Sequence, residues 1–169
     1  GIFVDSFGAL SGDQSIILHG NASENSGDQI SLYLERFDIS LVNSLLPKDF
    51  GIKGAVTGMA SLTSPVSGKD IMIDMLCDSC YVADIPLGVL KAGMQWNEPK
   101  GTFDFKIRNE IGGTHNINVS GGMNPANKSL NASAQLDRFE IGYAQPFLED
   151  VFSEMKGNIS GELDLSGPL

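Results

Sequence analysis

The stretch "LERFDI" at residues 34–39 has a near copy, "LDRFEI", at residues 136–141. The neighbourhoods of the two stretches also match. Downstream, "KGAVTGMASL" at 53–62 parallels "KGNISGELDL" at 156–165, and upstream "SIILHG" at 15–20 parallels "NINVSG" at 116–121. The matching stretches are 101 to 103 residues apart, and a nearly constant period of this kind is the sequence signature of a repeat architecture. We therefore expect one repeat at 1–102 and the first two thirds of the next at 103–169, continuous with the first, in a fragment of a longer protein.

Within each repeat, apolar and polar residues alternate strictly. Phe103, Phe105 and Ile107 are separated by single charged residues, and Ile117 and Val119 are separated by Asn118. This period of two indicates strands with one apolar and one wettable face, which antiparallel sheets tolerate and buried parallel sheets do not. Turn-forming stretches separate the strands, for example "NEPKG" at 97–101, "GG" at 112–113 and "NPANK" at 124–128.

The repeated stretch also marks a change of phase. Apolar residues occupy even positions up to Leu34 and odd positions from Phe37 onward, and the same slip separates Leu136 from Phe139. A slip of one residue is what a β-bulge produces, although a strand that simply ends there would look the same. Either way, we expect the chain to bend at Arg36 and Phe37 and again at Arg138 and Phe139.

After each bend the apolar spacing becomes helical. The spacings i, i+3 and i+4 predict a short amphipathic helix in each repeat, more suited to capping a core than to binding a membrane. The apolar positions are Leu41, Val42, Leu45 and Leu46 in the first repeat, and Tyr143, Phe147, Leu148, Val151 and Phe152 in the second.

Composition excludes several classes of function. The net charge of −10 argues against nucleic-acid binding, which requires a basic surface, and against docking on an anionic membrane. No run approaches the length of a spanning helix and no signal peptide is present, so we expect any membrane anchor to lie outside this fragment. No nucleophile elbow, phosphate loop or paired carboxylate suggests an enzyme, and nothing indicates a cofactor.

The cysteines Cys77 and Cys80, in "CDSC", are the only candidates for metal or redox chemistry in the sequence. A lone pair is a weak zinc motif, because zinc takes four ligands. On a regular strand, residues three apart point to opposite faces, so a disulfide between these two would need an intervening turn. A local disulfide and two incidental thiols both stay open.

The order of these motifs resembles a known family. The pattern "L-x-R-F-[DE]-I", a short helix and then "K-G-x-[VI]-x-G-x-x-x-L", with "IPLGVLKAGMQW" at 85–96 and "SGPL" at 166–169, is similar to the repeats of TamB and other AsmA-like proteins of Gram-negative bacteria. The abundance of Asn, Ser and Gly is closest to the versions from Bacteroidetes. The resemblance implies a periplasmic protein, anchored at the inner membrane outside this fragment, with an apolar β-trough. It also implies a role in outer-membrane biogenesis, with phospholipid and an outer-membrane barrel assembly factor as partners, and no catalytic site.

The expected fold is all-β: a curved, elongated, antiparallel-type sheet that forms a taco-like trough or an open sandwich. The alternating residues place their apolar side chains either in an open groove or in a closed core, and the sequence does not separate the two. For a groove, the function is conduction of phospholipid or another acyl-chain lipid between the two membranes. The alternatives are a chaperone-like scaffold that adds a strand to outer-membrane β-proteins, and a stalk or surface sugar-binding protein. The expected lining residues are Ile16, Leu18, Val56, Leu62, Phe103, Phe105, Ile107, Ile117, Val119, Ile159, Leu163 and Leu165.

Overall fold

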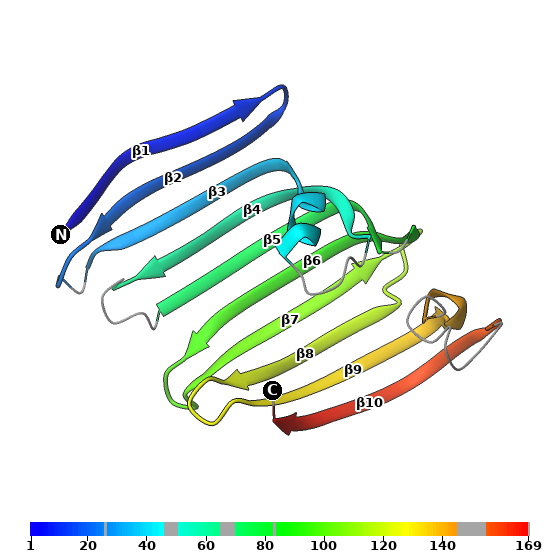
Figure 1. The fold of residues 1–169 in the computed structure, drawn as a ribbon. Coiled ribbons are helices and arrows are strands. Elements are labelled where there is room, and N and C mark those ends of the chain that lie inside the picture. The colour runs from blue at the N-terminus through cyan, green and yellow to red at the C-terminus, as the bar shows by residue number, and fades with distance from the viewer. Residues whose placement is uncertain (26, 46–50, 65–69, 83, 145–154, 169) are drawn as a thin grey trace.

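A computed structural model describes residues 1–25, 27–45, 51–64, 70–82, 84–144 and 155–168. In these residues the chain forms one antiparallel sheet of ten strands, each hydrogen-bonded to the next in sequence order (Figure 1). The expectation of an all-β antiparallel sheet is confirmed. The sheet also runs without a break from β6 to β7, across the boundary expected between repeats. The strands are β1 (Ile2–Ser11), β2 (Gln14–Ala22), β3 (Gln29–Asp38), β4 (Lys53–Thr63), β5 (Asp70–Val82), β6 (Ile85–Asn97), β7 (Thr102–Glu110), β8 (Ile117–Asn124), β9 (Ser129–Glu140) and β10 (Asn158–Pro168).

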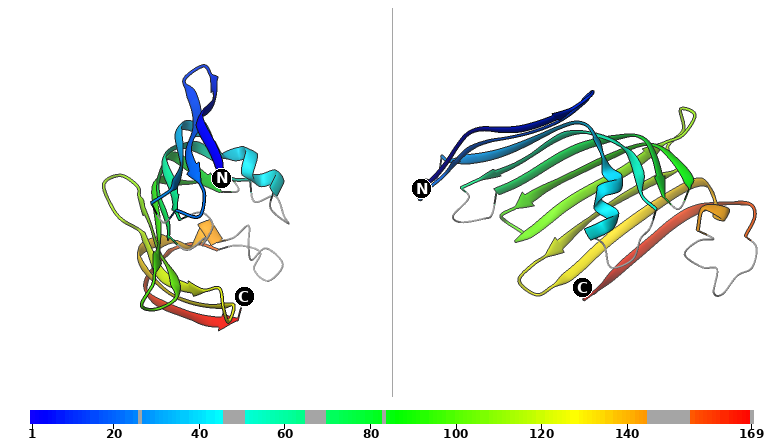
Figure 2. Two further views of the ribbon diagram at one scale, coloured as in Figure 1. Left: turned by 90° about the vertical axis from the view of Figure 1, so that its left-hand side faces the viewer. Right: turned by 45° about the horizontal axis from the view of Figure 1, so that its top comes forward.

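The sheet is a single curved layer. Seen along its edge, it curls so that β1 and β10 approach the same side, and the two short helical segments lie on that concave side (Figure 2). No second sheet faces the first within the described residues, so the expected trough agrees with this architecture and the open sandwich does not. The strands lie in the sheet in the order of the sequence, because antiparallel neighbours can be joined directly and need no crossover connection.

A β-bulge lies at each repeated stretch. The register between β3 and β4 shifts between Leu34 and Phe37, and the register between β9 and β10 shifts opposite Ile159 and Gly161. Arg36 and Arg138 adopt left-handed backbone conformations there, with φ of 48° and 46°. An extra residue on one strand increases local twist, so both bulges contribute to the curvature of the sheet.

The helical segments differ from expectation. Residues Ile39–Leu45 form a 3-10 helix, η1, and Ile141–Ala144 form a second, η2, so the expected amphipathic helix per repeat is not found in the described residues. Such 3-10 geometry is common in short connecting segments, and both segments connect two strands. Most of the second expected stripe, including Phe147, Leu148, Val151 and Phe152, lies outside the described residues, as does Leu46.

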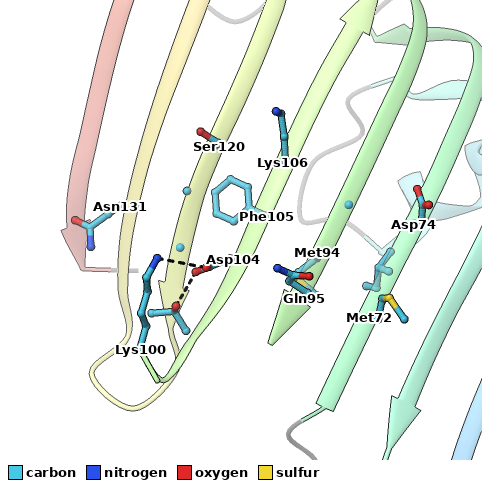
Figure 3. A pocket seen from close by; sticks show the side chains of 15 residues that line it. Met72, Asp74, Met94, Gln95, Lys100, Asp104, Phe105, Lys106, Ser120 and Asn131 are labelled. Carbon is cyan, nitrogen blue, oxygen red and sulfur yellow. Dashed lines mark hydrogen bonds and ion pairs between the residues drawn. The ribbon is translucent and has the colours of Figure 1, made fainter. Parts of the chain in front are cut away.

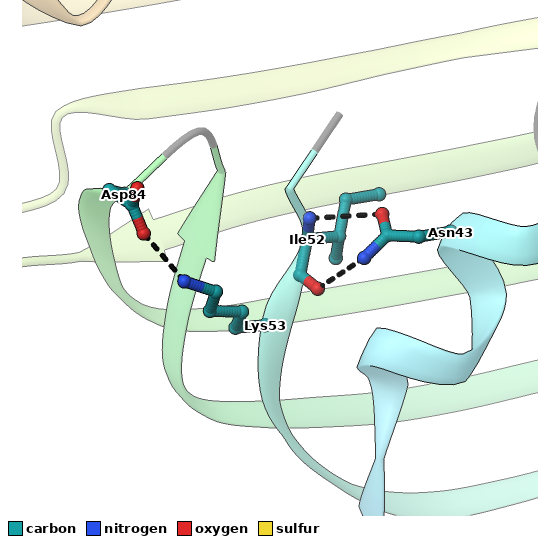
Figure 4. A network of polar contacts seen from close by, with 4 residues as sticks. All are labelled: Asn43, Ile52, Lys53 and Asp84. Carbon is teal, nitrogen blue, oxygen red and sulfur yellow. Dashed lines mark hydrogen bonds and ion pairs between the residues drawn. The ribbon is translucent and has the colours of Figure 1, made fainter. Parts of the chain in front are cut away.

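Hydrogen bonds attach η1 to the start of β4. The Asn43 side-chain amide donates to the Ile52 carbonyl at 2.8 Å and accepts from the Ile52 amide at 3.0 Å, so it pairs with the backbone as a strand residue would (Figure 4). The next residue, Lys53, forms an ion pair of 2.6 Å with Asp84 beyond the end of β5. Ile39 of η1 packs on the concave side against a small buried cluster of Val56, Cys77 and Cys80.

Candidate functional site

The pairing register shows which side chains share the concave face. Residues directly opposite each other in antiparallel strands point to the same side of the sheet. Ile39 packs on the concave side against Val56 of β4 and Cys77 of β5, so these residues identify the concave face. Residue pairs on that face can then be followed from β1 to β10. The first complete row is Ala9, Ile16, Leu34, Gly58, Met75, Ala92, Ile107, Val119, Ala134 and Leu163.

A second complete row lies beside the first and is also apolar in every strand. Nine spacings between ten strands make each row about 43 Å long. Neither row contains a charged or hydrogen-bonding side chain. The second row is Phe7, Leu18, Leu32, Ala60, Ile73, Met94, Phe105, Gly121, Ala132 and Leu165.

Further apolar residues flank these rows toward the strand ends. Phe37, Val56, Cys77 and Leu90 are paired in sequence across β3 to β6, and Asn109 follows them in β7. At the opposite strand ends, Trp96 pairs with Phe103, and their ring centroids are 4.8 Å apart.

The apolar face is only partly covered. Its side chains are mostly half-buried, because neighbours within the sheet shield their sides while their ends stay accessible. Among the described hydrophobic residues, only Val56, Cys77 and Cys80 are fully buried, and Leu165 in β10 is 63% exposed. For the described part of the chain, this face is the open side of a single sheet and not the interior of a sandwich.

All twelve predicted lining residues lie on this concave face. Ile16 and Leu18 are in β2, Val56 and Leu62 in β4, three more in β7, two in β8 and the last three in β10. Their contact with lipid stays a prediction. The predicted lining omitted β1, β3, β5, β6 and β9, which contribute residues such as Leu32, Ile73 and Met94. The same period of two runs through these strands and would have identified them.

The opposite, convex face is mixed: exposed apolar side chains such as Ile17 and Tyr33 lie on it beside charged ones. A depression of about 760 Å³, lined by both polar and apolar residues, extends from β5 to β9 (Figure 3). Its charged side chains include Lys100, Lys106, Asp74 and Asp104. Hydrogen bonds from Asn97 at 2.6 Å and Thr102 at 2.7 Å lower the pKa of Asp104, with a smaller contribution from Lys100 at 3.6 Å. The polar groups of this depression therefore partly satisfy one another.

The bulges have the same local geometry in both repeated stretches. The Arg36 amide donates to the Thr57 hydroxyl at 3.1 Å, and the Arg138 amide donates to the Ser160 hydroxyl at 2.8 Å. In both cases the acceptor is the residue directly before the second glycine of the downstream motif, opposite the bulge. Arg36 and Arg138 therefore contribute to the two bulges through their backbones.

In a comparison with known families, residues 13–169 match the model described as TamB, N-terminal domain. The chain belongs to the TamB N-terminal domain family. No curated protein and no solved structure matches the chain significantly. TamB membership indicates a cell-envelope protein of a transport or assembly family, not an enzyme family.

In the described ranges, no helix has the length and apolar character needed to cross a membrane. Over the same residues, no three His, Cys, Asp or Glu side chains are grouped so that they could hold a metal ion.

Proposed function

We propose that the concave face conducts phospholipid, or another acyl-chain lipid, between the inner and outer membranes during outer-membrane biogenesis. The observation that carries this proposal is the pair of unbroken apolar rows, which cross all ten strands without a charged side chain. Lipid chains would lie against these rows, and the polar headgroups would project into water at the open side of the groove.

Burial of acyl chain can supply the binding energy. Covering one methylene group from water is worth roughly 0.8 kcal/mol, so a groove that shelters most of an acyl chain needs no charged contact to hold it. Because the two rows stay apolar from strand to strand, a bound chain meets similar surroundings at each step. A uniform lining of this kind lets lipid slide along the groove without a deep trap.

The proposed setting is the periplasm of a Gram-negative bacterium, in a protein anchored at the inner membrane. A barrel assembly factor of the outer membrane is the proposed protein partner. Both proposals rest on membership in the TamB family and on the groove.

One observation favours a second candidate, an assembly scaffold that acts by strand addition. In the described residues, β1 and β10 each pair on one side only, so each leaves an outer edge of backbone donors and acceptors. Such edges can accept a strand of an unfolded β-protein.

Photo-crosslinking in cells separates these functions by side-chain parity. A crosslinking residue at Phe103, Phe105, Ile117 or Val119 faces the groove, and at Asp104, Lys106 or Asn118 it faces the convex side. The conduit predicts phospholipid adducts at the first set and few at the second. High-mass protein adducts concentrated at β1 or β10 would favour the scaffold, and the absence of lipid adducts at both parities would refute the conduit.

A further inference from the structure

The two cysteines lie on the same face of β5, although they are three residues apart. Cys77 pairs with Leu90 of β6 and Cys80 pairs with Gly88, two residues earlier on the same strand. Positions two apart on a strand share a face. The register therefore places both cysteines on the concave side, and both are buried there, 4% and 3% exposed, in one cluster with Val56.

An irregularity in β5 brings the two residues together. The register shifts between Cys77 and Cys80, and Ser79 has a left-handed backbone with φ of 50°. On a regular strand, residues three apart are separated by about 10 Å, beyond the 4.4–6.8 Å that a disulfide requires between α-carbons. The bulge removes this obstacle, since it supplies the turn that a regular strand lacks.

Gly54 of β4 shows how close the two cysteines are. A β-carbon at Gly54 would lie 2.5 Å from the Cys77 sulfur and 3.3 Å from the Cys80 α-carbon. The Cys77 sulfur and the Cys80 α-carbon therefore both lie close to Gly54, on the side of β5 that faces β4.

We propose that Cys77 and Cys80 are a disulfide site, in which a covalent bond fixes the β5 bulge at the edge of the groove. The structure contains both as free thiols. In the reaction, a thiolate of one cysteine attacks a protein or small-molecule disulfide and releases one thiol from it. The second cysteine then attacks this mixed disulfide and releases the other thiol. The pair loses two electrons and two protons in total, and the external disulfide is reduced to two thiols.

Burial also determines when the bond forms. It is the main cause that raises the pKa of the Cys77 thiol to about 12, and it raises the pKa of Cys80 as well. The folded protein therefore contains little thiolate at neutral pH, and thiolate is the nucleophile in exchange. The exchange belongs to the stage of folding before the cluster with Val56 closes.

Alkylation tests the proposal on the unmodified chain. The protein is exported to an oxidising compartment, quenched with acid, denatured and treated with N-ethylmaleimide before mass measurement, with and without prior reduction. We expect no adduct without reduction and two after it, with residues 77 and 80 joined in one peptide. One adduct, two adducts without reduction, or a disulfide-linked dimer would each overturn the proposal.

A matched pair in the regular part of the same strand tests the role of the bulge. Met72→Cys and Met75→Cys, in a Cys77→Ser, Cys80→Ser background, also place cysteines three apart in β5, where the register is unbroken. We expect this pair to stay reduced under the same treatment. Equal oxidation of both pairs would show that the bulge does not create the site. Neither outcome depends on lipid conduction, so the proposal can fail while the proposed function stands.

Discussion

At the residue scale, Asn109 interrupts the apolar lining and holds the end of β7 to two neighbouring segments. It is 1% exposed. Its side-chain oxygen accepts from the backbone amides of Asn116 at 3.1 Å and Ile117 at 2.7 Å, and its amide donates to the Leu87 carbonyl at 3.3 Å. The side chain thus satisfies backbone groups where β8 begins, which explains why a polar residue occupies this position of an apolar row.

Replacing Asn109 by Ala should lower the free energy of unfolding by about 2–3 kcal/mol, because the backbone amides of two partly buried residues lose their acceptor. Urea unfolding followed by circular dichroism measures the change. The control is Asn131→Ala on the exposed part of the convex face, which should stay within about 0.5 kcal/mol of the parent. Equal effects of the two substitutions would show that the hydrogen bonds of Asn109 contribute little.

Gly54 and Gly157 occupy the same place in the two repeated motifs, but only the first is crowded. Both have positive φ, 144° and 110°, while an added β-carbon would meet the Cys77 sulfur at Gly54 and nothing within 4 Å at Gly157. Under reducing conditions, Gly54→Ala should therefore cost about 1–3 kcal/mol more than Gly157→Ala, since overpacking adds to the backbone strain. Cys77→Ala should recover part of that excess in the double variant. No recovery would mean that the sulfur is not the obstacle.

At the element scale, the bulge in β3 places a non-glycine residue in the left-handed region. This conformation costs an L-residue about 1–2 kcal/mol. The Arg36 side chain offsets little of it, because its ion pair with Asp13 is exposed at 57% and 69%, and exposed pairs contribute about 0–1 kcal/mol. The strain is tolerated because the Arg36 amide still has an acceptor in Thr57.

Two substitutions at Arg36 separate backbone strain from side-chain contacts. Arg36→Val should be less stable than Arg36→Gly by about 1–2 kcal/mol, because a β-branched residue is disfavoured at φ of 48° and glycine is not. Both variants lose the ion pair with Asp13, so their difference in urea unfolding reports the backbone alone. If the valine variant is as stable as the glycine variant, the left-handed conformation is not required at this bulge.

The turn between β6 and β7 contributes a pH-dependent stability through Asp104. Hydrogen bonds from Asn97 and Thr102 lower the pKa of this carboxyl below its value in the unfolded chain. The stabilisation is therefore present above the unfolded pKa and is lost as the pH falls through the lower, folded pKa. We expect Asp104→Asn to be less stable than the parent at pH 7 and to approach it in acid, in unfolding experiments across pH 2–7. A constant difference across that range would contradict this origin.

The strands were more predictable than the other elements. A period of two is a direct consequence of pleating, so residues such as Phe105 and Val119 could be assigned to one face, and the phase slip at Arg36 could be seen in the sequence. The amphipathic helix expected from Leu41 onward was mispredicted, because so few apolar residues do not separate an α-helix from a short 3-10 helix. The β5 bulge was not predicted because "CDSC" contains no alternation of apolar and polar residues in which a shift of one residue could be seen. Asn109 could not be foreseen, since its role depends on a carbonyl in another strand.

At the scale of the whole molecule, the stability of a one-layer sheet with an uncovered apolar face depends on what lies against that face. The described residues contain only three fully buried hydrophobic side chains, far fewer than a closed domain would bury. Contacts along the rows and backbone pairing supply the rest of the stability. A ligand that binds only the folded sheet would add to it by mass action.

A charge placed on the concave apolar face should affect stability differently if that face is open to water or closed in solution. The substitution Val119→Arg tests which is the case. Val119 lies in the first complete row, between Ile107 and Ala134, and is half-buried. In an open groove the long arginine side chain can extend its charged end to water, so we expect a loss of stability of about 1 kcal/mol or less and a large loss of lipid adducts in cells. The control, Ser120→Arg, places the same charge on the exposed convex side and should change neither. A charge enclosed without a partner would instead unfold a marginally stable domain. Global unfolding of Val119→Arg beside a folded Ser120→Arg would therefore mean that the face is closed in solution, and the groove could not then serve as a conduit.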